Sequence, residues 1–300
     1  IRPAEAKPLP NLPLSENDNP YRGLDAYETK NAPVFFGRRE HTNALLEHVL
    51  AQSLTVLVGF SGSGKSSTVR AGLIPALRIA AMADPAQLAP ELLNLVERYQ
   101  DTRKDHHEKA RGEWFIPEPV RPELHPWRAF HQLCGYLAPA PPAEEEGVAS
   151  TEGRAQRSLM EACLVFKQRY PGCRALLVLD QMEELITSGL SLPERTRLLD
   201  ELARFAELPD NPVHLVLTLR SDFETHFAVS SLSSLWIRSR FKNPPMNRAE
   251  LREIIVEPAH ARVMEIELVG SRPQGTSAPQ PAPRPAPAPP PAPRPAPAPK

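Results

Sequence analysis

The sequence predicts an α/β protein in which a central, mostly parallel β-sheet is flanked by helices. Three short apolar runs, at residues 54–58, 175–179 and 213–219, have the composition of strands that are buried on both faces. Segments with apolar residues at helical spacing separate these runs, and strands that alternate with helices are typical of parallel sheets. A chain of 300 residues, 41% of them hydrophobic, is large enough to bury a substantial core.

The expected helices follow from apolar periodicity and from end signals. An amphipathic helix is predicted from residues 40 to 51, directly before the first strand. A second helix follows that strand from residue 66 and is expected to stop between Gly72 and Pro75. Further helices are predicted at 158–170, around 198–205 after a capping box of Ser191 and Glu194, and at 247–256. Residues 84–153 are less regular and contain one candidate edge strand, near 114–120.

The two ends of the chain differ from the middle in composition. Residues 1–19 form a leader rich in proline and asparagine, and residues 270–300 form a tail in which a Pro-Ala-Pro-Arg pattern repeats. Such a tail favours extended polyproline II and is expected to be a disordered spacer, with an SH3-type ligand as the alternative. The domain itself is therefore expected to span residues 20–269. Since the sequence begins with Ile1, we expect it to be a fragment or a processed product.

Charge and cysteine content exclude several classes of protein. The net charge is −1, and the last 30 residues carry four basic and no acidic side chains, so the expected domain is mildly acidic and gives no sign of binding nucleic acid. Three cysteines without a C-x-x-C pair argue against a disulfide framework and against a thiolate zinc site. A reducing, cytoplasmic setting is expected. No apolar stretch approaches the ~20 residues that span a bilayer.

The most informative stretch is GFSGSGKS, residues 59–66, which lies between the first strand and the following helix. Its glycines let successive backbone N–H groups turn inward around phosphate oxygens at the positive end of a helix. Lys65 is expected to reach the β- and γ-phosphates, and the Ser66 hydroxyl to bind Mg²⁺. The predicted nucleotide-binding residues of this loop are Gly59, Ser61, Gly62, Ser63, Gly64, Lys65, Ser66 and Ser67.

Polar residues at the ends of the other two strands complete the predicted site, because ligands of α/β sheets bind beyond the carboxyl ends of the strands. Asp180 ends the run LLVLD and is expected to hold Mg²⁺ opposite Ser66. Glu183 is the preferred residue for orienting the attacking water, and helix capping is the alternative role for both Glu183 and Glu184. Arg220 ends the third strand and is expected to sense the γ-phosphate.

Several other polar or aromatic residues are not expected to form a metal site or a nucleic-acid site. His106, His107 and Glu108 are adjacent rather than one helical turn apart, so solvated surface is expected there instead of a metal site. His41 and His48 are expected to be surface or capping residues. The three tryptophans are scattered along the chain, so core packing is expected rather than an aromatic platform for nucleic acid: Trp114, Trp127 and Trp236.

In these motifs the chain resembles the STAND class of P-loop NTPases (signal-transduction ATPases with numerous domains), specifically the first type of novel STAND domain. The resemblance extends from about Asn19 to Met264 through NPYRGLDAY, FFGRRE, VGFSGSGKSSTVRAGLIPAL, LLVLDQMEEL, LTLRSDF and PPMNRAELREIIVEPA. It implies that Arg38 lies near the base or ribose, that Arg220 is the sensor arginine and that Pro245 approaches the nucleotide. Family members continue into a winged-helix or helical lid, often followed by WD40 repeats, so the helix from Asn247 is expected to begin such a lid.

These features together predict an ATP-binding, Mg²⁺-dependent ATPase module of a multidomain signalling switch, with slow hydrolysis. ATP is preferred over GTP chiefly by the resemblance, and the chain lacks both the Asn-Lys-x-Asp motif of GTPases and the LSGGQ signature of ABC proteins. The expected partners are ATP and ADP, further copies of the activated domain, and a trigger sensed by domains outside this chain. The alternatives are a scaffold that binds ATP or ADP without hydrolysis and a P-loop phosphotransferase.

Overall fold

The computed structural model describes residues 19–82, 96, 99–123, 125–139 and 157–270, with the backbone alone for residues 262–270. Almost all of the predicted leader and of the predicted tail, and part of the irregular region 84–153, lie outside the described residues. The chain divides into a first unit that ends at Ala261 and a second that begins at Arg262. Every side-chain contact below belongs to the first unit. Within the described part of the chain, no helix has the length and hydropathy needed to cross a membrane.

The centre of the first unit is a five-stranded sheet in which every pairing is parallel, as the sequence predicts. The strands lie in the order β2-β3-β4-β1-β5. Strand β4 is therefore placed between the strand that leads into the glycine-rich loop and the strand that ends at Asp180. The strand bounds are β1 Leu54–Gly59, β2 Trp114–Phe115, β3 Arg174–Leu179, β4 Val213–Arg220 and β5 Arg240–Lys242.

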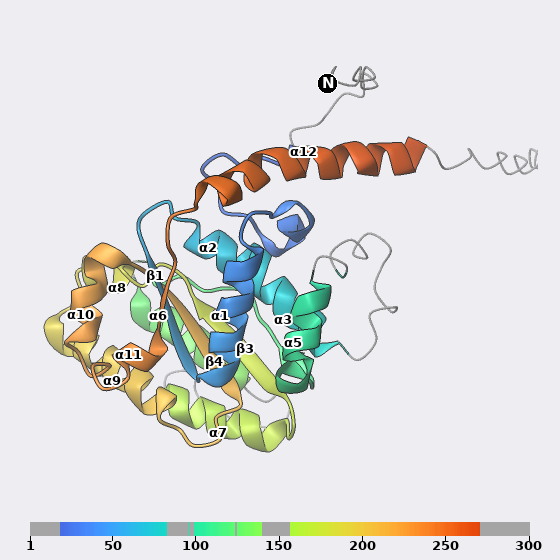
Figure 1. The fold of residues 1–300 in the computed structure, drawn as a ribbon. Coiled ribbons are helices and arrows are strands. Elements are labelled where there is room, and N and C mark those ends of the chain that lie inside the picture. The colour runs from blue at the N-terminus through green and yellow to red at the C-terminus, as the bar shows by residue number, and fades with distance from the viewer. Residues whose placement is uncertain (1–18, 83–95, 97–98, 124, 140–156, 271–300) are drawn as a thin grey trace, which may run out of the picture. The chain divides into compact units, whose positions relative to one another are not determined.

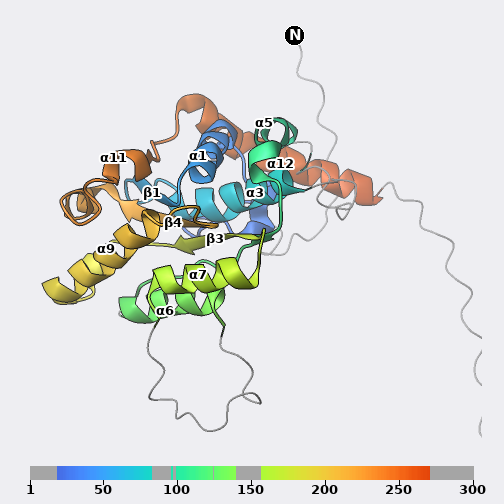
Figure 2. The same ribbon diagram turned by 90° about the horizontal axis from the view of Figure 1, so that it is seen from below.

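Helices cover both faces of this sheet, as Figures 1 and 2 show. One face packs in a hydrophobic cluster with α1 Arg39–Ala51, α3 Ile74–Ala81 and α5 Gln100–Ala110. The other face packs with α6 Pro126–Leu137, α7 Leu159–Arg169 and α9 Leu192–Ala206. Shorter helices are α2 Lys65–Ser67, α8 Glu184–Thr187, α10 Glu224–Ala228 and α11 Trp236–Ser239, with 3₁₀ turns η2 Thr29–Val34 and η6 Ser221–Phe223. The segment η3 Thr68–Leu73 is a π-helix, and α12 is Arg248–Gly270.

The predicted strands and most predicted helices are present, with their end signals. Ser158 caps α7 by accepting a hydrogen bond from the Glu161 backbone at 3.2 Å, and Ser191 and Glu194 form the capping box of α9. The structure adds the helices α5 and α6, both within the region 84–153 that the sequence predicts to be less regular. It also adds the three-residue edge strand β5, and at the opposite edge the candidate strand near 114–120 is reduced to two residues and an isolated bridge at Val120.

The helix after the first strand does not stop between Gly72 and Pro75, so that prediction is wrong. It widens into the π-turn η3 and continues as α3. The amide of Ile74 bonds the carbonyl of Val69, five residues back, so Pro75, which has no N–H, is accommodated without a break. Gly72 is required by close packing, because a Cβ there would lie 2.8 Å from the Thr42 hydroxyl.

Two histidine predictions are also wrong. His106 is not solvated surface: it is buried on α5, in a helix of otherwise charged sequence, because that helix packs against α3. Its neighbour His107 is half-buried and bonds the Ala80 carbonyl at 2.8 Å. Among the described residues, no group of three or more His, Cys, Asp or Glu side chains has the arrangement of a metal site.

His214, the second residue of β4, is buried and must be neutral. Its Nε2 faces an Arg174 nitrogen at 2.7 Å, and its Nδ1 faces the carbonyls of Val49 and Gln52 at 2.8 and 2.9 Å. Since arginine can only donate, Nε2 accepts and Nδ1 carries the proton. Burial and then the Arg174 charge lower the pKa of His214 to about 4.

The packing around Gly72 yields a matched pair of substitutions. Gly72→Ala should lower the free energy of unfolding by about 1–3 kcal/mol, because Thr42 and Phe35 leave no room for a methyl group. Gly135→Ala on α6 meets nothing within 4 Å and should raise it by about 0.5–1 kcal/mol through helix propensity. Urea unfolding of both variants measures the difference. Stabilisation of both variants would contradict the close contact at Gly72.

The neutral state of His214 predicts a pH-dependent stability. Because the folded pKa is lowered, its contribution is complete above the ordinary value near 6.5 and is lost as the pH falls towards about 4. The free energy of unfolding of the unaltered protein should therefore fall more steeply between pH 6.5 and 4 than that of His214→Gln, by roughly 3 kcal/mol in total. Urea titrations across this range test it. His260→Gln, at an exposed histidine, is the control and should leave the slope unchanged; parallel slopes for His214→Gln would refute the assignment.

Candidate active site

The predicted site residues meet at one edge of the sheet, where the carboxyl ends of β1, β3 and β4 lie side by side. A cleft of about 790 Å³ opens there, within the size range of small-molecule sites. Predicted residues that line it are Ser61, Gly62, Gly64, Lys65, Ser66, Ser67, Glu183 and Arg220. The described lining does not include Gly59, Ser63, Asp180, Arg38 or Pro245.

The glycine-rich loop has the backbone that the sequence predicts. Gly62 and Gly64 adopt φ values of +71° and +82°, a left-handed conformation that other residues rarely adopt, although a Cβ at either position would meet nothing within 4 Å. Gly59 is required by space, since a Cβ there would lie 2.7 Å from the Asn243 carbonyl oxygen. The loop ends in the first turn of α2 at Lys65, so the backbone amides of a helix N-terminus face the cleft.

Lys65 is held inside the loop that it serves. Its ammonium donates to the carbonyls of Gly59 and Phe60, each at 2.9 Å, which takes two of its three donors and leaves one for a ligand. Burial lowers the pKa of Lys65 below its ordinary value, while the nearby carboxylates of Glu183 and Asp180 act in the opposite direction. The side chain is thus a partly desolvated cation at the wall of the cleft.

Ser66 and Asp180 lie together as predicted. The Ser66 hydroxyl donates to Asp180 Oδ1 at 2.8 Å, and Thr218 on the intervening strand β4 donates to the same oxygen at 2.6 Å. Asp180 is almost completely buried, at 1% exposure. Thr218 also accepts from the Gln181 amide at 2.8 Å, so it fixes both the carboxylate and the turn that follows it. Thr218 was not predicted, and the signal that could have identified it is a polar residue inside the buried run LTLR.

The turn after Asp180 brings Glu183 to the cleft. Gln181 has a φ of +64°, an unusual left-handed conformation for this residue, and the amide of Met182 bonds back to Thr218 O at 2.9 Å. Glu183 then accepts from the Arg220 backbone amide at 3.2 Å through one carboxylate oxygen. Glu184 points elsewhere, since its carboxylate accepts from the Glu123 amide at 2.6 Å. Of the two glutamates, only Glu183 faces the cleft.

Arg220 reaches the cleft from the end of β4, directly opposite Gly59 in the strand register. Its guanidinium is paired with Asp222, which holds the pKa of that carboxyl below its ordinary value, and it lies 5.4 Å from the centre of the Phe223 ring. Because the contact to Asp222 is made through Nη2, other N–H groups of Arg220 remain for a phosphate oxygen in a sensor role.

Arg38 lies behind the glycine-rich loop, at 2% exposure, and does not line the cleft. It donates to Pro244 O at 2.7 Å and to Ser63 O at 3.4 Å, and it lies 3.8 Å from Glu250 on α12. Pro245, which was expected to approach the nucleotide, is exposed and does not line the cleft. Its neighbour Met246 lines the cleft instead.

Asn243 is a second support of the same loop and was not predicted. Its side-chain amide donates to Ser63 O at 2.8 Å, and its carbonyl oxygen is 2.8 Å from His41 Nε2. His41 and His48, predicted to be surface or capping residues, are instead half-buried against the Phe241 ring of β5. Burial lowers the pKa of both histidines. No local signal identifies these contacts, since β5 is only three residues long.

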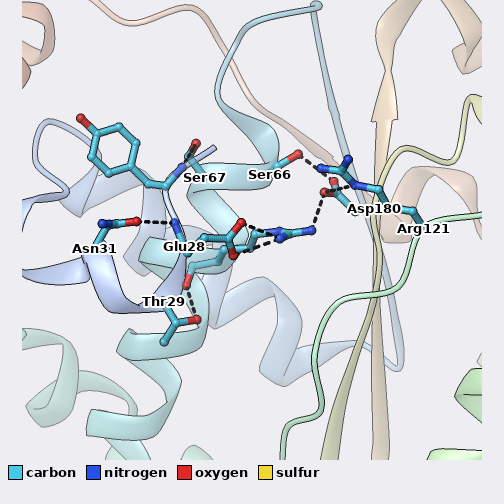
Figure 3. A network of polar contacts seen from close by, with 9 residues as sticks. Glu28, Thr29, Asn31, Ser66, Ser67, Arg121 and Asp180 are labelled. Carbon is cyan, nitrogen blue, oxygen red and sulfur yellow. Dashed lines mark hydrogen bonds and ion pairs between the residues drawn. The ribbon is translucent and has the colours of Figure 1, made fainter. Parts of the chain in front are cut away.

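Two arginines that were not predicted complete the surroundings of Asp180, and Figure 3 shows one of them, Arg121, beside the carboxylate. Arg70 Nη2 donates to Asp180 Oδ2 at 3.3 Å, and Arg121 Nε lies 3.6 Å from the same oxygen. The other nitrogen of Arg70, Nη1, donates to Glu28 at 2.8 and 3.0 Å. These residues come from three separate segments, so no motif spacing brings them together.

The site fits a nucleotide with Mg²⁺. The Ser66 hydroxyl and the Asp180 carboxylate are hard oxygen donors 2.8 Å apart, which is the ligand type that Mg²⁺ takes, and Lys65 keeps a free donor beside them. The left-handed glycines and the start of α2 provide amides for phosphate oxygens. The arrangement can therefore bind polyphosphate through the loop and a metal ion through Ser66 and Asp180.

The chain is similar to one family of known proteins and to several solved structures. The family model described as Novel STAND NTPase 1 matches residues 20–272. One similar solved structure is the Orc1 protein of Aeropyrum pernix in complex with DNA, with 19% identity and a TM-score of 0.44 over 77% of this chain and 51% of that chain. Another is the Walker-type ATPase paby2304 of Pyrococcus abyssi, with 15% identity and a TM-score of 0.39 over 82% of this chain and 62% of that chain. The chain thus spans about half and about three-fifths of the two. No curated protein matches it.

The position of Arg38 predicts an effect that does not depend on the base. Arg38→Met removes a support of the Ser63 carbonyl, so the affinities for ATP and for GTP should both fall by the same factor, about 5–10-fold. Binding of fluorescent ATP and GTP analogues measures the two factors. Glu250→Gln keeps the loop contact while removing the ion pair and should have a smaller effect. A loss confined to ATP would instead place Arg38 at the base.

Proposed function

The chain belongs to the Novel STAND NTPase 1 family, and on that premise we propose that it is an ATP-binding, Mg²⁺-dependent ATPase module of a multidomain signalling switch. In this proposal slow hydrolysis of ATP controls the conformation and assembly of a longer protein. The observation that carries the proposal is the convergence of Lys65, Ser66 and Glu183 on one cleft, with Asp180 directly behind Ser66.

Each residue has a role that follows from its place. When bound between Ser66 and Asp180, Mg²⁺ would neutralise phosphate charge and polarise the γ-phosphoryl group. Glu183 would orient a water molecule and accept its proton as the water oxygen bonds to phosphorus and the bond to the β–γ bridging oxygen breaks. Lys65 and Arg220 would offset the charge that develops on the phosphate oxygens. Asp180 is assigned to the metal rather than to the attacking water, because its carboxylate is held against the Ser66 hydroxyl and does not line the cleft as Glu183 does.

Nucleotide specificity depends on the apolar part of the cleft. Residues with aromatic or aliphatic surface extend the lining away from the glycine-rich loop: Tyr21, Val34, Phe36, Met246, Ile254 and Ile255. We assign the base to this surface rather than to Arg38, since an adenine ring is mostly apolar. The preference for ATP over GTP still depends on the family.

Slow hydrolysis is supported by the partners of the two catalytic candidates. One oxygen of Glu183 is engaged by the Arg220 amide, and the Arg220 guanidinium by Asp222. These contacts compete with a ligand for one oxygen of Glu183 and one nitrogen of Arg220, which favours a long-lived bound state. The same observation supports a second candidate function, a scaffold that binds ATP or ADP without hydrolysing it. The switch proposal has three further parts. Other domains, such as WD40 repeats, sense a trigger; the activated domain associates with further copies of itself; and the protein is located in the cytoplasm.

Nucleotide binding and single-turnover hydrolysis of Lys65→Ala and Glu183→Gln separate these functions. Lys65→Ala should lose binding at least 100-fold, since it removes the cation of the phosphate site. Glu183→Gln should bind ATP normally but hydrolyse it at least 100-fold more slowly than the unaltered protein. Glu184→Gln is the matched control, because that carboxylate faces Glu123, and should hydrolyse at the normal rate.

The possible outcomes point to different functions. If the unaltered protein binds ATP but forms no ADP over hours, the scaffold is correct. Hydrolysis at the same rate in Glu183→Gln would refute the role of Glu183. Transfer of phosphate to a small acceptor rather than to water would identify a phosphotransferase.

A further inference from the structure

A short segment before the first helix is docked on the helix that follows the glycine-rich loop. Three consecutive residues make the contacts. The Tyr27 amide donates to the Ser67 hydroxyl at 3.1 Å, Glu28 pairs with Arg70, and the Thr29 hydroxyl donates to the Arg70 carbonyl at 3.1 Å. Figure 3 shows this segment beside Ser66 and Ser67, so it lies next to the metal-binding hydroxyl of the proposed site.

The π-turn explains why this docking occurs at Arg70. The amide of Ile74, which would bond Arg70 O in an α-helix, bonds Val69 O instead, and the next candidate donor, Pro75, has no N–H. The Arg70 carbonyl therefore lacks a donor within its own helix. The Thr29 hydroxyl supplies the missing hydrogen bond, so the widened turn creates the acceptor that holds the segment.

The Arg70 guanidinium connects two carboxylates. Its Nη1 contacts both oxygens of Glu28, at 2.8 and 3.0 Å, and its Nη2 contacts Asp180 Oδ2 at the longer distance of 3.3 Å. The Arg70 side chain is 13% exposed and Asp180 is 1% exposed, whereas Glu28 is 41% exposed. Glu28 is thus the end of the network that is open to solvent, and Asp180 is the end at the metal site.

A cation held beside Asp180 acts against a second cation at the same carboxylate. Arg70 and Arg121 both face Asp180 Oδ2, while Ser66 faces Oδ1. The positive charge of the two arginines repels Mg²⁺. A closer approach of Arg70 to Asp180 would strengthen that ion pair and increase the repulsion. The negative charge of Glu28 draws the guanidinium towards the solvent side of the network, and so limits how strongly Arg70 opposes Mg²⁺ at Asp180.

We propose that Glu28 is a positioning residue of the metal site, which holds Arg70 in an ion pair and thereby limits its competition with Mg²⁺ for Asp180. This inference rests on the proposed function, since it requires Mg²⁺ and nucleotide at the same site. It assigns to residues 27–29 a role in setting metal affinity without any contact to the metal. Glu28→Gln keeps the shape of the side chain and removes the charge, so Arg70 should pair more strongly with Asp180 and Mg²⁺ should bind more weakly.

The measurement is the affinity for a fluorescent ATP analogue, in Mg²⁺ and in EDTA, on the full chain. The ratio of the two dissociation constants reports the contribution of the metal. In Glu28→Gln this ratio should fall by about five-fold, because an unopposed Arg70 guanidinium pairs more strongly with Asp180 and competes with Mg²⁺, while affinity in EDTA stays within about two-fold. In an Arg70→Met background, Glu28→Gln should leave the ratio unchanged, because the effect passes through Arg70.

Three further variants separate charge from structure. Thr29→Val breaks the docking contact without a change of charge and should lower the melting temperature but not the ratio. Glu47→Gln removes the charge of a glutamate paired with Lys109 on the surface and should change neither quantity. If Arg70→Met does not fold, Arg70→Lys replaces it, since a single ammonium cannot bridge Glu28 and Asp180 and should also suppress the effect of Glu28→Gln.

The inference is overturned if Glu28→Gln leaves the ratio unchanged, or lowers it equally with and without Arg70. A fall in affinity of the same size in Mg²⁺ and in EDTA would mean that Glu28 only stabilises the fold, and would also overturn it. These outcomes are distinct from failure of the proposed function, in which the unaltered protein would bind no nucleotide or bind it without dependence on Mg²⁺.

Discussion

The buried carboxylate of Asp180 is the constraint on which the rest of this site depends. A charge at 1% exposure is tolerated only when donors surround it. Here the partners come from three segments: the helix after the glycine-rich loop, through Ser66 and Arg70, the chain at Arg121 and strand β4 at Thr218. Removal of any of these segments would leave the carboxylate partly unmatched, so the need to satisfy one charge fixes the relative positions of otherwise separate parts of the chain.

The strand order makes this arrangement possible. Because β4 lies between β1 and β3, a residue near the end of β4 faces the ends of both neighbours. Thr218 can therefore bond Asp180 from the strand that pairs with β3, while Arg220 stands in register with Gly59 at the start of the glycine-rich loop. The left-handed turn at Gln181 then returns the chain towards β4 and places Glu183 on the Arg220 amide.

The sequence predicted those parts of the protein in which local pattern and tertiary structure agree. The buried strands at β1, β3 and β4, the capped helices α7 and α9, and the meeting of Ser66 with Asp180 are of this kind. It failed where a distant partner decides. Gly72 within the π-turn packs closely against Thr42, His106 is buried on a helix packed against α3, and the strand β5 exists through its pairing with β1. Such contacts between remote segments leave no periodic signal.

The position of Arg38 shows how a motif can be recognised correctly while the location of its side chain is not predicted. Its guanidinium is shared by the Ser63 carbonyl of the loop, the Pro244 carbonyl after β5 and Glu250 on α12. Gly37 beside it has no space for a Cβ, because Glu250 O would lie 2.6 Å away and Ile254 Cγ2 2.5 Å away. The start of α12 and the phosphate-binding loop are therefore supported by one side chain. Since coupling between binding and conformation is reciprocal, a displacement of α12 that breaks these contacts would weaken the loop, and phosphate bound in the loop would favour the docked helix.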